Sequence, residues 1–266
     1  MALARQLEQK RIVVIGGTTG LGWSAAQAFV RAGAQVVVVG RDPAACARAG
    51  RGLCEAGVAL NADATDPTTA PRAIGLAVEK FGGFDGLYHV AGGSGRKLGD
   101  GPLHEMSDQG WRATVDLNLT SLVFSNRAAV RQFLAQGTGG AILNIGSVLG
   151  SSPSPRFFAT HAYAAAKSAV IGLSKSVAAY YAPHGIRVNV LAPGLIETPM
   201  SERAAGDPVI RDFIRTKQPL DGGRIGAPSD LDAAAVFFLS EAAKFTTGQV
   251  LAVDGGWSVT EGNYKE

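Results

Sequence analysis

Short apolar runs alternate with longer segments of helical period along the chain, and this alternation predicts its fold. The apolar runs are rich in β-branched residues, as are the strands of a parallel sheet that is buried on both faces. Helical segments between such strands are typical of βαβ units. Seven strands are predicted, at residues 12–15, 35–39, 58–61, 86–90, 141–145, 187–191 and 250–253.

The segments between these runs predict helices, and their order predicts one domain. Helices are expected at about residues 20–32, 43–50, 67–80, 107–135, 161–182 and 229–241. A polar, proline-containing insert at about 195–227 is interpreted as a mobile flap over the substrate. No repeat, linker or low-complexity tract divides the chain. Residues 1–266 are therefore expected to form a single α/β domain, with a doubly wound, seven-stranded parallel sheet and helices on both faces.

Composition and charge exclude several classes of protein. With 46% hydrophobic and 18% charged residues, the chain has the apolar material for a core that disordered proteins lack. The net charge is +3 and basic residues are scattered among acids, so no nucleic-acid surface is expected. Cys46 and Cys54 have no histidine or second cysteine pair at metal-ligand spacing, which predicts two reduced thiols and no metal site.

The N-terminal segment and the hydropathy pattern bear on location. Residues 1–10 lack the apolar core of a signal peptide, and no uncharged apolar run reaches the length of a membrane span. A cytoplasmic protein without a membrane partner is therefore expected.

A glycine-rich turn follows the first predicted strand and leads directly into a helical segment. Glycines let the backbone approach a pyrophosphate, and a helix N-terminus presents free N–H groups to it. The spacing is Gly-x3-Gly-x-Gly rather than the commoner Gly-x-Gly-x-x-Gly, and a purely structural turn is the alternative. The turn predicts dinucleotide binding by Gly16, Thr18, Thr19, Gly20, Leu21 and Gly22.

The end of the second strand bears on which dinucleotide is bound. Gly40 stands where an NAD site would place an acid for the ribose hydroxyls, and Arg41 follows it. A guanidinium can bind a 2′-phosphate, which a carboxylate would repel. The sequence therefore favours NADP(H). Arg41 as a plain surface residue is the alternative, and the nearby Asp42 leaves NAD(H) possible.

Tyr163 and Lys167 form the strongest chemical signal. They lie four residues apart in an alanine-rich segment, so they share one face of a predicted helix. A neighbouring ammonium and an oxidised nicotinamide are expected to lower the pKa of the phenol, which would make Tyr163 a general acid and base. Ser147 ends a strand and is placed to hydrogen-bond a developing oxyanion. Taken alone, a half-buried tyrosine and a surface lysine would explain the pair.

Together these motifs resemble those of the short-chain dehydrogenase/reductase family over essentially the whole chain. The shared features follow the family's order and approximate spacing. They are the glycine motif at residues 16–22, Asp63, Asn118, Ser147, Tyr163 with Lys167, Pro193-Gly194, and the closing segment 247–256.

The resemblance implies a Rossmann fold and a catalytic tetrad of Asn118, Ser147, Tyr163 and Lys167. It implies that Lys167 also binds the nicotinamide ribose, and that Asn118 supports a water chain from a distorted helix. A surface or capping asparagine is the alternative for Asn118. Further cofactor contacts implied by the family are Asp63, Ala64, Val90, Ala91, Gly92, Tyr163, Pro193, Gly194, Ile196 and Thr198.

The chain departs from the family pattern at two neighbouring places. Where the family has Asn-Asn-Ala-Gly, this chain has His89-Val90-Ala91-Gly92, and Ile15 replaces a threonine before the first glycine. An apolar contact between Ile15 and Val90 is expected to replace the family's polar tie. His89 is interpreted as a packing histidine, with a catalytic role as the alternative.

The resulting expectation is an oxidoreductase that interconverts a carbonyl and an alcohol. The closest similarity is to 3-oxoacyl-carrier-protein reductases and sugar or polyol dehydrogenases. The walls of the substrate pocket are expected at 93–102, 149–160 and 195–218, which hold several aromatic residues and the basic residues Arg96, Lys97, Arg156, Arg211 and Arg215. A homotetramer that packs through segments 107–135 and 161–182 is implied by the family. The alternatives are an NAD-linked alcohol or sugar dehydrogenase and a non-catalytic NADP(H)-binding regulator.

Overall fold

The protein is built around one seven-stranded parallel sheet. The computed structural model describes residues 5–263. Neighbouring strands follow the order β3-β2-β1-β4-β5-β6-β7, and every pair is parallel. The strands are β1 (Arg11–Ile15), β2 (Gln35–Gly40), β3 (Gly57–Asn61), β4 (Gly86–His89), β5 (Gly140–Ile145), β6 (Ile186–Pro193) and β7 (Val250–Val253). The seven predicted strands and the doubly wound sheet are confirmed, with only the strand ends displaced.

The strand order reverses between β1 and β4. From β1 the chain proceeds outward to β2 and β3, then crosses back to β4 and proceeds outward in the other direction to β7. Such a reversal opens a crevice at the carboxyl ends of the two central strands. Ile15 marks this point, since it is paired with Val39 of β2 and with His89 of β4.

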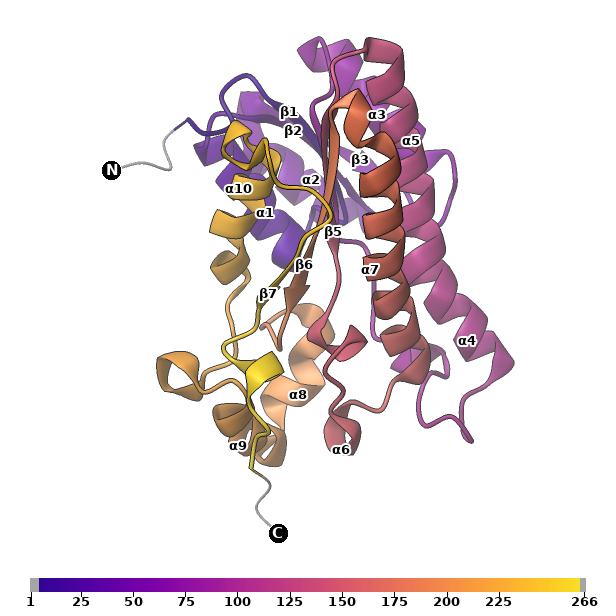
Figure 1. Ribbon diagram of the computed structural model, residues 1–266, viewed down its shortest axis with the longest axis vertical. Helices are drawn as coiled ribbons and strands as arrows, with labels where there is room; N and C mark the ends of the chain where they lie inside the picture. Colours follow the sequence, from indigo (N-terminus) through magenta and orange to yellow (C-terminus); the bar gives the residue numbers. More distant parts are fainter. Residues whose placement is uncertain (1–4, 264–266) are drawn as a thin grey trace.

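Helices cover both faces of the sheet, as Figure 1 shows. One face packs against α1 (Gly20–Arg31), α2 (Pro43–Leu53) and α10 (Asp232–Leu239). The other face packs against α3 (Thr69–Phe81), α5 (Ser121–Gln136) and α7 (His161–Tyr181). Each face has its own large apolar cluster, so the buried sheet separates two halves of the core.

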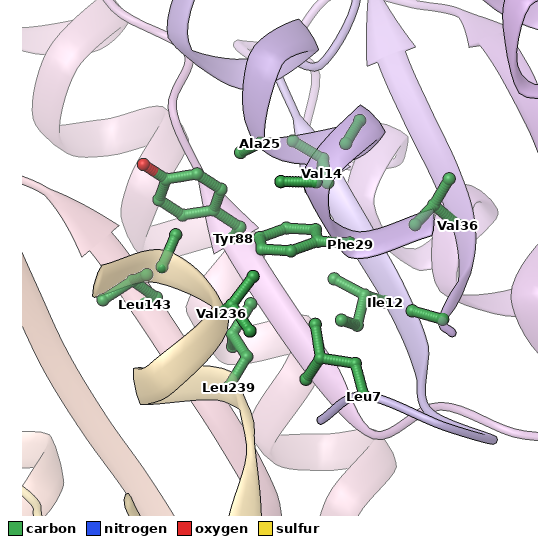
Figure 2. Packing of buried hydrophobic residues seen from close by; sticks show 14 of the residues in the cluster. Leu7, Ile12, Val14, Ala25, Phe29, Val36, Tyr88, Leu143, Val236 and Leu239 are labelled. Atoms are coloured by element: carbon green, nitrogen blue, oxygen red, sulfur yellow. The ribbon is translucent and has the colours of Figure 1, made fainter. Parts of the chain in front are cut away.

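The face toward α1 and α10 is filled almost entirely by aliphatic and aromatic side chains. Figure 2 shows Phe29 and Tyr88 side by side in this cluster, with ring centroids 5.9 Å apart. Both side chains are fully buried. Burial of such aromatic surface is a large contribution to stability, which makes this face the main apolar core.

The segment predicted as one helix at 107–135 is divided. Helix α4 (Asp108–Val115) leads into a π-helical turn at Asp116–Thr120, and α5 follows. The Asn118 side chain donates to the Thr114 carbonyl oxygen at 2.9 Å, which a regular helix would pair with a backbone N–H. A side chain thus replaces a backbone donor at the turn. The family's distorted helix is present here.

The insert expected as a polar flap at 195–227 contains regular structure. It holds α8 (Glu202–Gly206) and α9 (Pro208–Lys217), and Asp207 caps α9 by accepting hydrogen bonds from two backbone N–H groups. The Gln218 side chain holds the base of the insert, because it accepts a hydrogen bond from the Leu195 N–H and donates one to the Leu195 carbonyl oxygen. Sequence reasoning placed no helix here because the apolar positions of α9 pack on a small satellite cluster rather than on the sheet.

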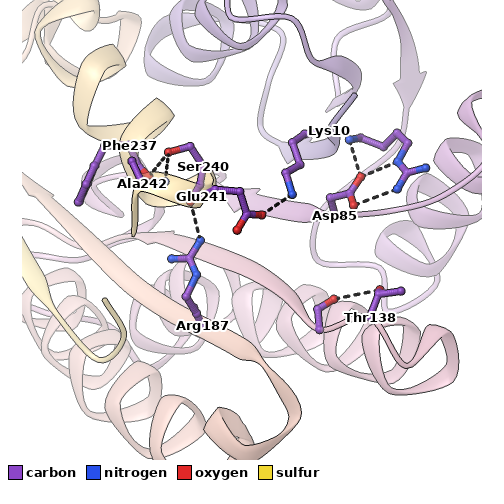
Figure 3. A network of polar contacts seen from close by, with 10 residues as sticks. Lys10, Asp85, Thr138, Arg187, Phe237, Ser240, Glu241 and Ala242 are labelled. Atoms are coloured by element: carbon purple, nitrogen blue, oxygen red, sulfur yellow. Dashed lines mark hydrogen bonds and ion pairs between the residues drawn. The ribbon is translucent and has the colours of Figure 1, made fainter. Parts of the chain in front are cut away.

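Polar contacts stabilise the end of the sheet where the strands begin, opposite the end where the strand order opens a crevice. Arg11 forms a two-pronged ion pair with Asp85, and Lys10 binds Glu241 at 2.6 Å (Figure 3). Arg187 donates to the Ser240 carbonyl oxygen in the same region. These contacts connect strand starts to neighbouring loops and leave the carboxyl edge free for binding.

Candidate active site

A groove at the carboxyl ends of β1, β2 and β4 collects most of the predicted cofactor residues. Among the predicted residues, Gly16, Thr18, Thr19, Gly20, Leu21, Arg41, Asp63, Ala64, Val90, Ala91, Gly92 and Thr198 line it. It is also lined by residues that sequence reasoning missed, namely Val39, Gly40, Ala62, Leu117, Pro199 and Met200. Several of these residues adjoin a predicted residue in sequence, and this adjacency is the signal that could have identified them.

The glycine turn has the tight packing that a dinucleotide cradle requires. Gly16 has φ +86°, and a Cβ there would lie 2.6 Å from the backbone nitrogen of Ala91. A Cβ on Gly22 would lie 2.1 Å from the Gly16 carbonyl oxygen, so this glycine shapes the turn without lining the groove. Helix α1 begins at Gly20, and its N-terminus faces the groove through Gly20 and Leu21. These features fit the pyrophosphate of a dinucleotide.

The contact predicted between Ile15 and Val90 is replaced by backbone hydrogen bonds. Ile15 packs in the cluster on the α5 face, whereas Val90 packs against the cluster on the α1 face. The Ile15 carbonyl oxygen instead accepts hydrogen bonds from the N–H groups of Val90 at 2.8 Å and Ala91 at 2.9 Å. Side chains alternate between faces along a strand, and the prediction overlooked this.

Three residues at the end of β2, Gly40, Arg41 and Asp42, determine the charge around the ribose position. A Cβ on Gly40 would lie 2.2 Å from the Thr18 hydroxyl oxygen, so Thr18 occupies the space that an acidic side chain would need. Asp42 is engaged as the N-cap of α2 and accepts a hydrogen bond from the Ala45 N–H. Arg41 is exposed and lies 3.8 Å from Asp63, with both side chains bordering the groove.

Ser147, Tyr163 and Lys167 come together beyond the end of β5. Tyr163 and Lys167 are buried on α7, and the Lys167 ammonium lies 5.6 Å from the centroid of the Tyr163 ring. The ammonium donates to the Ile145 carbonyl oxygen at 2.9 Å, which holds it at the strand end. Ser147 follows that strand, and its hydroxyl oxygen accepts a hydrogen bond from the Leu149 N–H at 3.2 Å. The predicted spacing therefore brings a hydroxyl, a phenol and an ammonium to one buried place.

Burial dominates the electrostatics of this group. It raises the pKa of Tyr163, and the neighbouring Ser147 hydroxyl opposes part of that rise. Without a cofactor the pKa of the phenol is thus raised, and the expected lowering by the ammonium and an oxidised nicotinamide together stays a prediction. Burial also lowers the pKa of Lys167 to about 8. An added positive charge in this site would favour the phenolate form of Tyr163.

Asn118 supports the loop after β4. Its side-chain amide donates to the Gly93 carbonyl oxygen at 2.9 Å, and its carbonyl accepts from the Gly93 N–H at 3.1 Å. A Cβ on Gly92 would lie 2.7 Å from the Asn118 oxygen and 3.5 Å from the Lys167 nitrogen. Asn118 is thus fully buried between the cofactor groove and the lysine, which excludes the surface or capping alternative.

Sequence reasoning missed Asp100, which fixes the start of α7. Its carboxylate accepts hydrogen bonds from the Ala162 N–H at 3.0 Å and the Tyr163 N–H at 2.9 Å. Asp100 is itself buried. No local motif marks this residue, because its partners are 62 and 63 positions away in the sequence.

The segment after β6 places the remaining predicted cofactor residues. Pro193 ends the strand, and a Cβ on Gly194 would lie 2.7 Å from the Gln218 side-chain oxygen. Ile196 is buried in the core cluster of the α1 face, while Thr198 lines the groove. The Ile196 side chain therefore serves packing, which leaves its backbone as the part able to face a cofactor.

His89 is a fully buried packing residue beside this site. Its Nδ1 lies 2.7 Å from the Ser125 hydroxyl, and that hydroxyl donates to the Leu122 carbonyl oxygen. The other ring nitrogen, Nε2, lies 3.4 Å from the Ser121 hydroxyl. Burial, together with the nearby Lys167 charge, lowers the pKa of His89 to about 3. The packing interpretation fits this environment.

Comparison with known proteins supports the family assignment. A family model described as enoyl-(acyl carrier protein) reductase matches residues 16–258. The cis-4-hydroxycyclohexanecarboxylate dehydrogenase of Sinomonas cyclohexanicum is 35% identical over 92% of this chain and 95% of its own. The 3beta-hydroxysteroid dehydrogenase 2 of Eggerthella lenta is also 35% identical, over 92% of this chain and 94% of its own.

A solved structure agrees with these relatives. A short-chain type dehydrogenase/reductase from Mycobacterium ulcerans superposes with a TM-score of 0.87 and 33% identity, covering 96% of this chain and 92% of that one. The chain belongs to the short-chain dehydrogenase/reductase family. As a member of that family it is an NAD(P)-dependent oxidoreductase. Among residues 5–263, no helix is long and apolar enough to cross a membrane.

Proposed function

We propose that this dehydrogenase/reductase uses NADP(H) to interconvert a ketone and a secondary alcohol, with Tyr163 as the general acid and base. The observation that carries the proposal is the buried group of Ser147, Tyr163 and Lys167 beside the groove. A binding-only regulator has no need for a phenol and an ammonium at this place. The non-catalytic alternative is disfavoured for that reason.

Each residue of the group has one role in the proposed mechanism. NADP(H), when bound, supplies or accepts the hydride. Tyr163 gives its phenolic proton to the carbonyl oxygen in reduction and takes the proton back in oxidation, which contributes about 10²–10⁴-fold to the rate. Ser147 hydrogen-bonds the same oxygen and orients it. Lys167 holds a positive charge beside the phenol, and Asn118 fixes the loop between the lysine and the groove.

Three features support NADP(H) over NAD(H). Thr18 blocks the position of an acid at Gly40, and Asp42 is already bonded to the start of α2. Arg41 remains as an exposed cation at the rim of the groove. Its partner Asp63 is weakly engaged at 3.8 Å, so a 2′-phosphate would compete well for the guanidinium.

The substrate is proposed to be a partly apolar secondary alcohol. The names of the two relatives place a hydroxyl group on a cyclohexane ring or a steroid. The helical insert at 195–227 is proposed to cover such a substrate, and its small cluster brings Phe213 and Ile214 against Val148 near Ser147.

We also propose a cytoplasmic homotetramer. Trp111, Leu134 and Tyr180 support this assembly, because these large side chains are exposed on α4, α5 and α7. Light scattering should give a mass four times that of one chain.

The mechanism is tested by Tyr163→Phe, assayed by nicotinamide absorbance with a panel of ketones. We expect turnover to fall at least about 100-fold while NADPH binding, followed by nicotinamide fluorescence, is retained. Near-normal turnover in this variant would refute the role of Tyr163.

The cofactor preference is tested by Arg41→Ala, which should weaken NADPH binding roughly tenfold and leave NADH binding unchanged. Arg51→Ala, at the far end of α2, is the matched control.

A further inference from the structure

Three segments that wall the substrate region meet at one backbone carbonyl. Helix α6 (Pro155–Phe158) lies between Ser147 and Tyr163, and the Phe157 carbonyl oxygen lies at its end. Arg96, from the loop after β4, donates to this oxygen at 3.0 Å. Arg203, from α8 in the helical insert, donates to the same oxygen, also at 3.0 Å. Two guanidinium groups from different segments therefore converge on one carbonyl oxygen.

These two cations have little compensation for their charge. Within residues 5–263, neither Arg96 nor Arg203 has a carboxylate within 4.0 Å, whereas several other arginines are paired in this way. Each guanidinium has five N–H donors, and one neutral oxygen accepts one bond from each. Burial and the nearby Arg203 lower the pKa of Arg96, and the charge of Asp100 offsets part of this lowering.

Arg96 and Arg203 belong to segments that also contact the catalytic helix or line the cofactor groove. Arg96 stands in the loop that Asp100 anchors to the Tyr163 N–H. Arg203 follows Thr198, Pro199 and Met200, all of which line the cofactor groove. The ring of Phe157, which carries the shared carbonyl, packs on Phe213 with centroids 5.2 Å apart. The carbonyl that both cations share thus belongs to a residue whose ring packs in the small apolar cluster of the insert.

Resting on the proposed function, we infer that Arg96 and Arg203 bind a carboxylate carried by the substrate at the end remote from its reacting carbon. The planar guanidinium matches the two oxygens of a carboxylate, and two such groups can hold it from both sides. The apolar side chains of the pocket contact the body of the molecule, while the arginines fix its charged end. The substrate class is therefore a hydroxy acid or keto acid whose two functional groups are well separated.

A purely structural role for the pair makes a different prediction. If the arginines only fasten α6, glutamine should serve nearly as well, because its amide can also donate to the Phe157 carbonyl. If they bind a carboxylate, loss of charge should matter even where the donor is kept. Arg96→Gln and Arg203→Gln separate these roles, with Arg72→Gln on the surface of α3 as the control.

The test measures binding to the NADP⁺-loaded enzyme by calorimetry. The probes are a series of aliphatic and alicyclic carboxylates without a carbonyl group, such as cyclohexanecarboxylate, each paired with its primary amide. We expect the wild type to bind the best carboxylate at least about tenfold more tightly than its amide. Each glutamine variant should lose roughly tenfold in carboxylate affinity with little change for the amide, and Arg72→Gln should match the wild type.

The outcomes separate this inference from the proposed reaction. No preference of the wild type for any carboxylate over its amide would overturn it, as would equal losses for both probes in the variants. Circular dichroism and thermal unfolding of the variants show whether α6 has loosened. Because these readouts need no turnover, they stand even if Tyr163→Phe disproves the catalytic proposal.

Discussion

Both faces of the sheet carry an apolar cluster, but they differ at the carboxyl ends of β4 and β5. Toward α1 and α10, the side chains of β1, β4 and β5 meet an apolar layer centred on Phe29 and Tyr88. Toward α5 and α7, the carboxyl ends of β4 and β5 carry His89 and Asn144, which meet buried serine and asparagine side chains. The strands are shared, so the difference lies in alternate residues of the same segments.

The polar layer is stable because its members are mutually satisfied. Asn126 and Asn144 exchange two hydrogen bonds of 2.9 Å, and Asn144 also donates to Ser174 at 3.0 Å. Buried polar groups cost little when paired and much when left alone. The layer lies next to Lys167 and holds α5 and α7, the helices that carry the site, in a fixed relation. Both apolar clusters stabilise the fold, and the polar layer on the α5 and α7 face also positions the chemistry.

Phe29→Ala should break the apolar face and give the largest effect. Removal of this fully buried ring should lower the free energy of unfolding by about 4 kcal/mol, because it leaves a cavity beside Tyr88. Urea denaturation at a fixed protein concentration measures the change, and turnover of the folded variant should stay close to the wild type. Phe245→Ala, at a fully exposed position, is the control with the same chemistry. A loss below about 1.5 kcal/mol would contradict this account of the face.

The sequence predicted the apolar face and the cofactor turn much better than the polar layer. Strand positions and the glycine turn follow from local patterns, since buried strands and tight turns restrict residue type at each position. The anchoring of α7 by Asp100 and the meeting of Arg96 with Arg203 depend on contacts across dozens of residues, which no local pattern encodes. The helices α8 and α9 were missed because their apolar residues pack in a small separate cluster with Val148 and Trp257 rather than on the sheet.

His89→Asn tests the polar layer through its pH dependence. The folded-state pKa of His89 is lowered to about 3, so below pH 6.5 the unfolded chain binds a proton that the folded chain does not. Stability is therefore fully present above pH 6.5 and falls as the pH drops toward 3, by about 2 kcal/mol between pH 6.5 and pH 5 from this group. Asparagine does not titrate, so the variant should lose less stability over the same interval.

The comparison is made by urea denaturation of both proteins at several pH values. His104→Asn is the matched control, since His104 is exposed and outside the polar layer, and its substitution should leave the slope unchanged. An identical slope in wild type and His89→Asn would mean that the ring is already protonated or accessible in the folded protein. The restored asparagine also matches the family's residue at this place, so little of the fold should be disturbed.

Tyr88→Phe should have the smallest effect and the opposite sign. The Tyr88 hydroxyl is buried on the apolar face, where it has no hydrogen-bond partner among residues 5–263, and burial raises the pKa of the phenol. Removing an unpaired buried hydroxyl from an otherwise unchanged ring should raise the free energy of unfolding by about 1 kcal/mol. Ser125→Ala is the counterpart on the polar face and should lower stability, because it removes the hydroxyl 2.7 Å from Nδ1 of the buried His89 ring. Loss of stability in Tyr88→Phe would mean that the hydroxyl is bonded after all, with Asp232 as the partner through a bridging water, since one oxygen of that buried carboxylate also lacks a partner. The apolar face would then contain a polar contact of its own, and the contrast between the two faces would be one of degree.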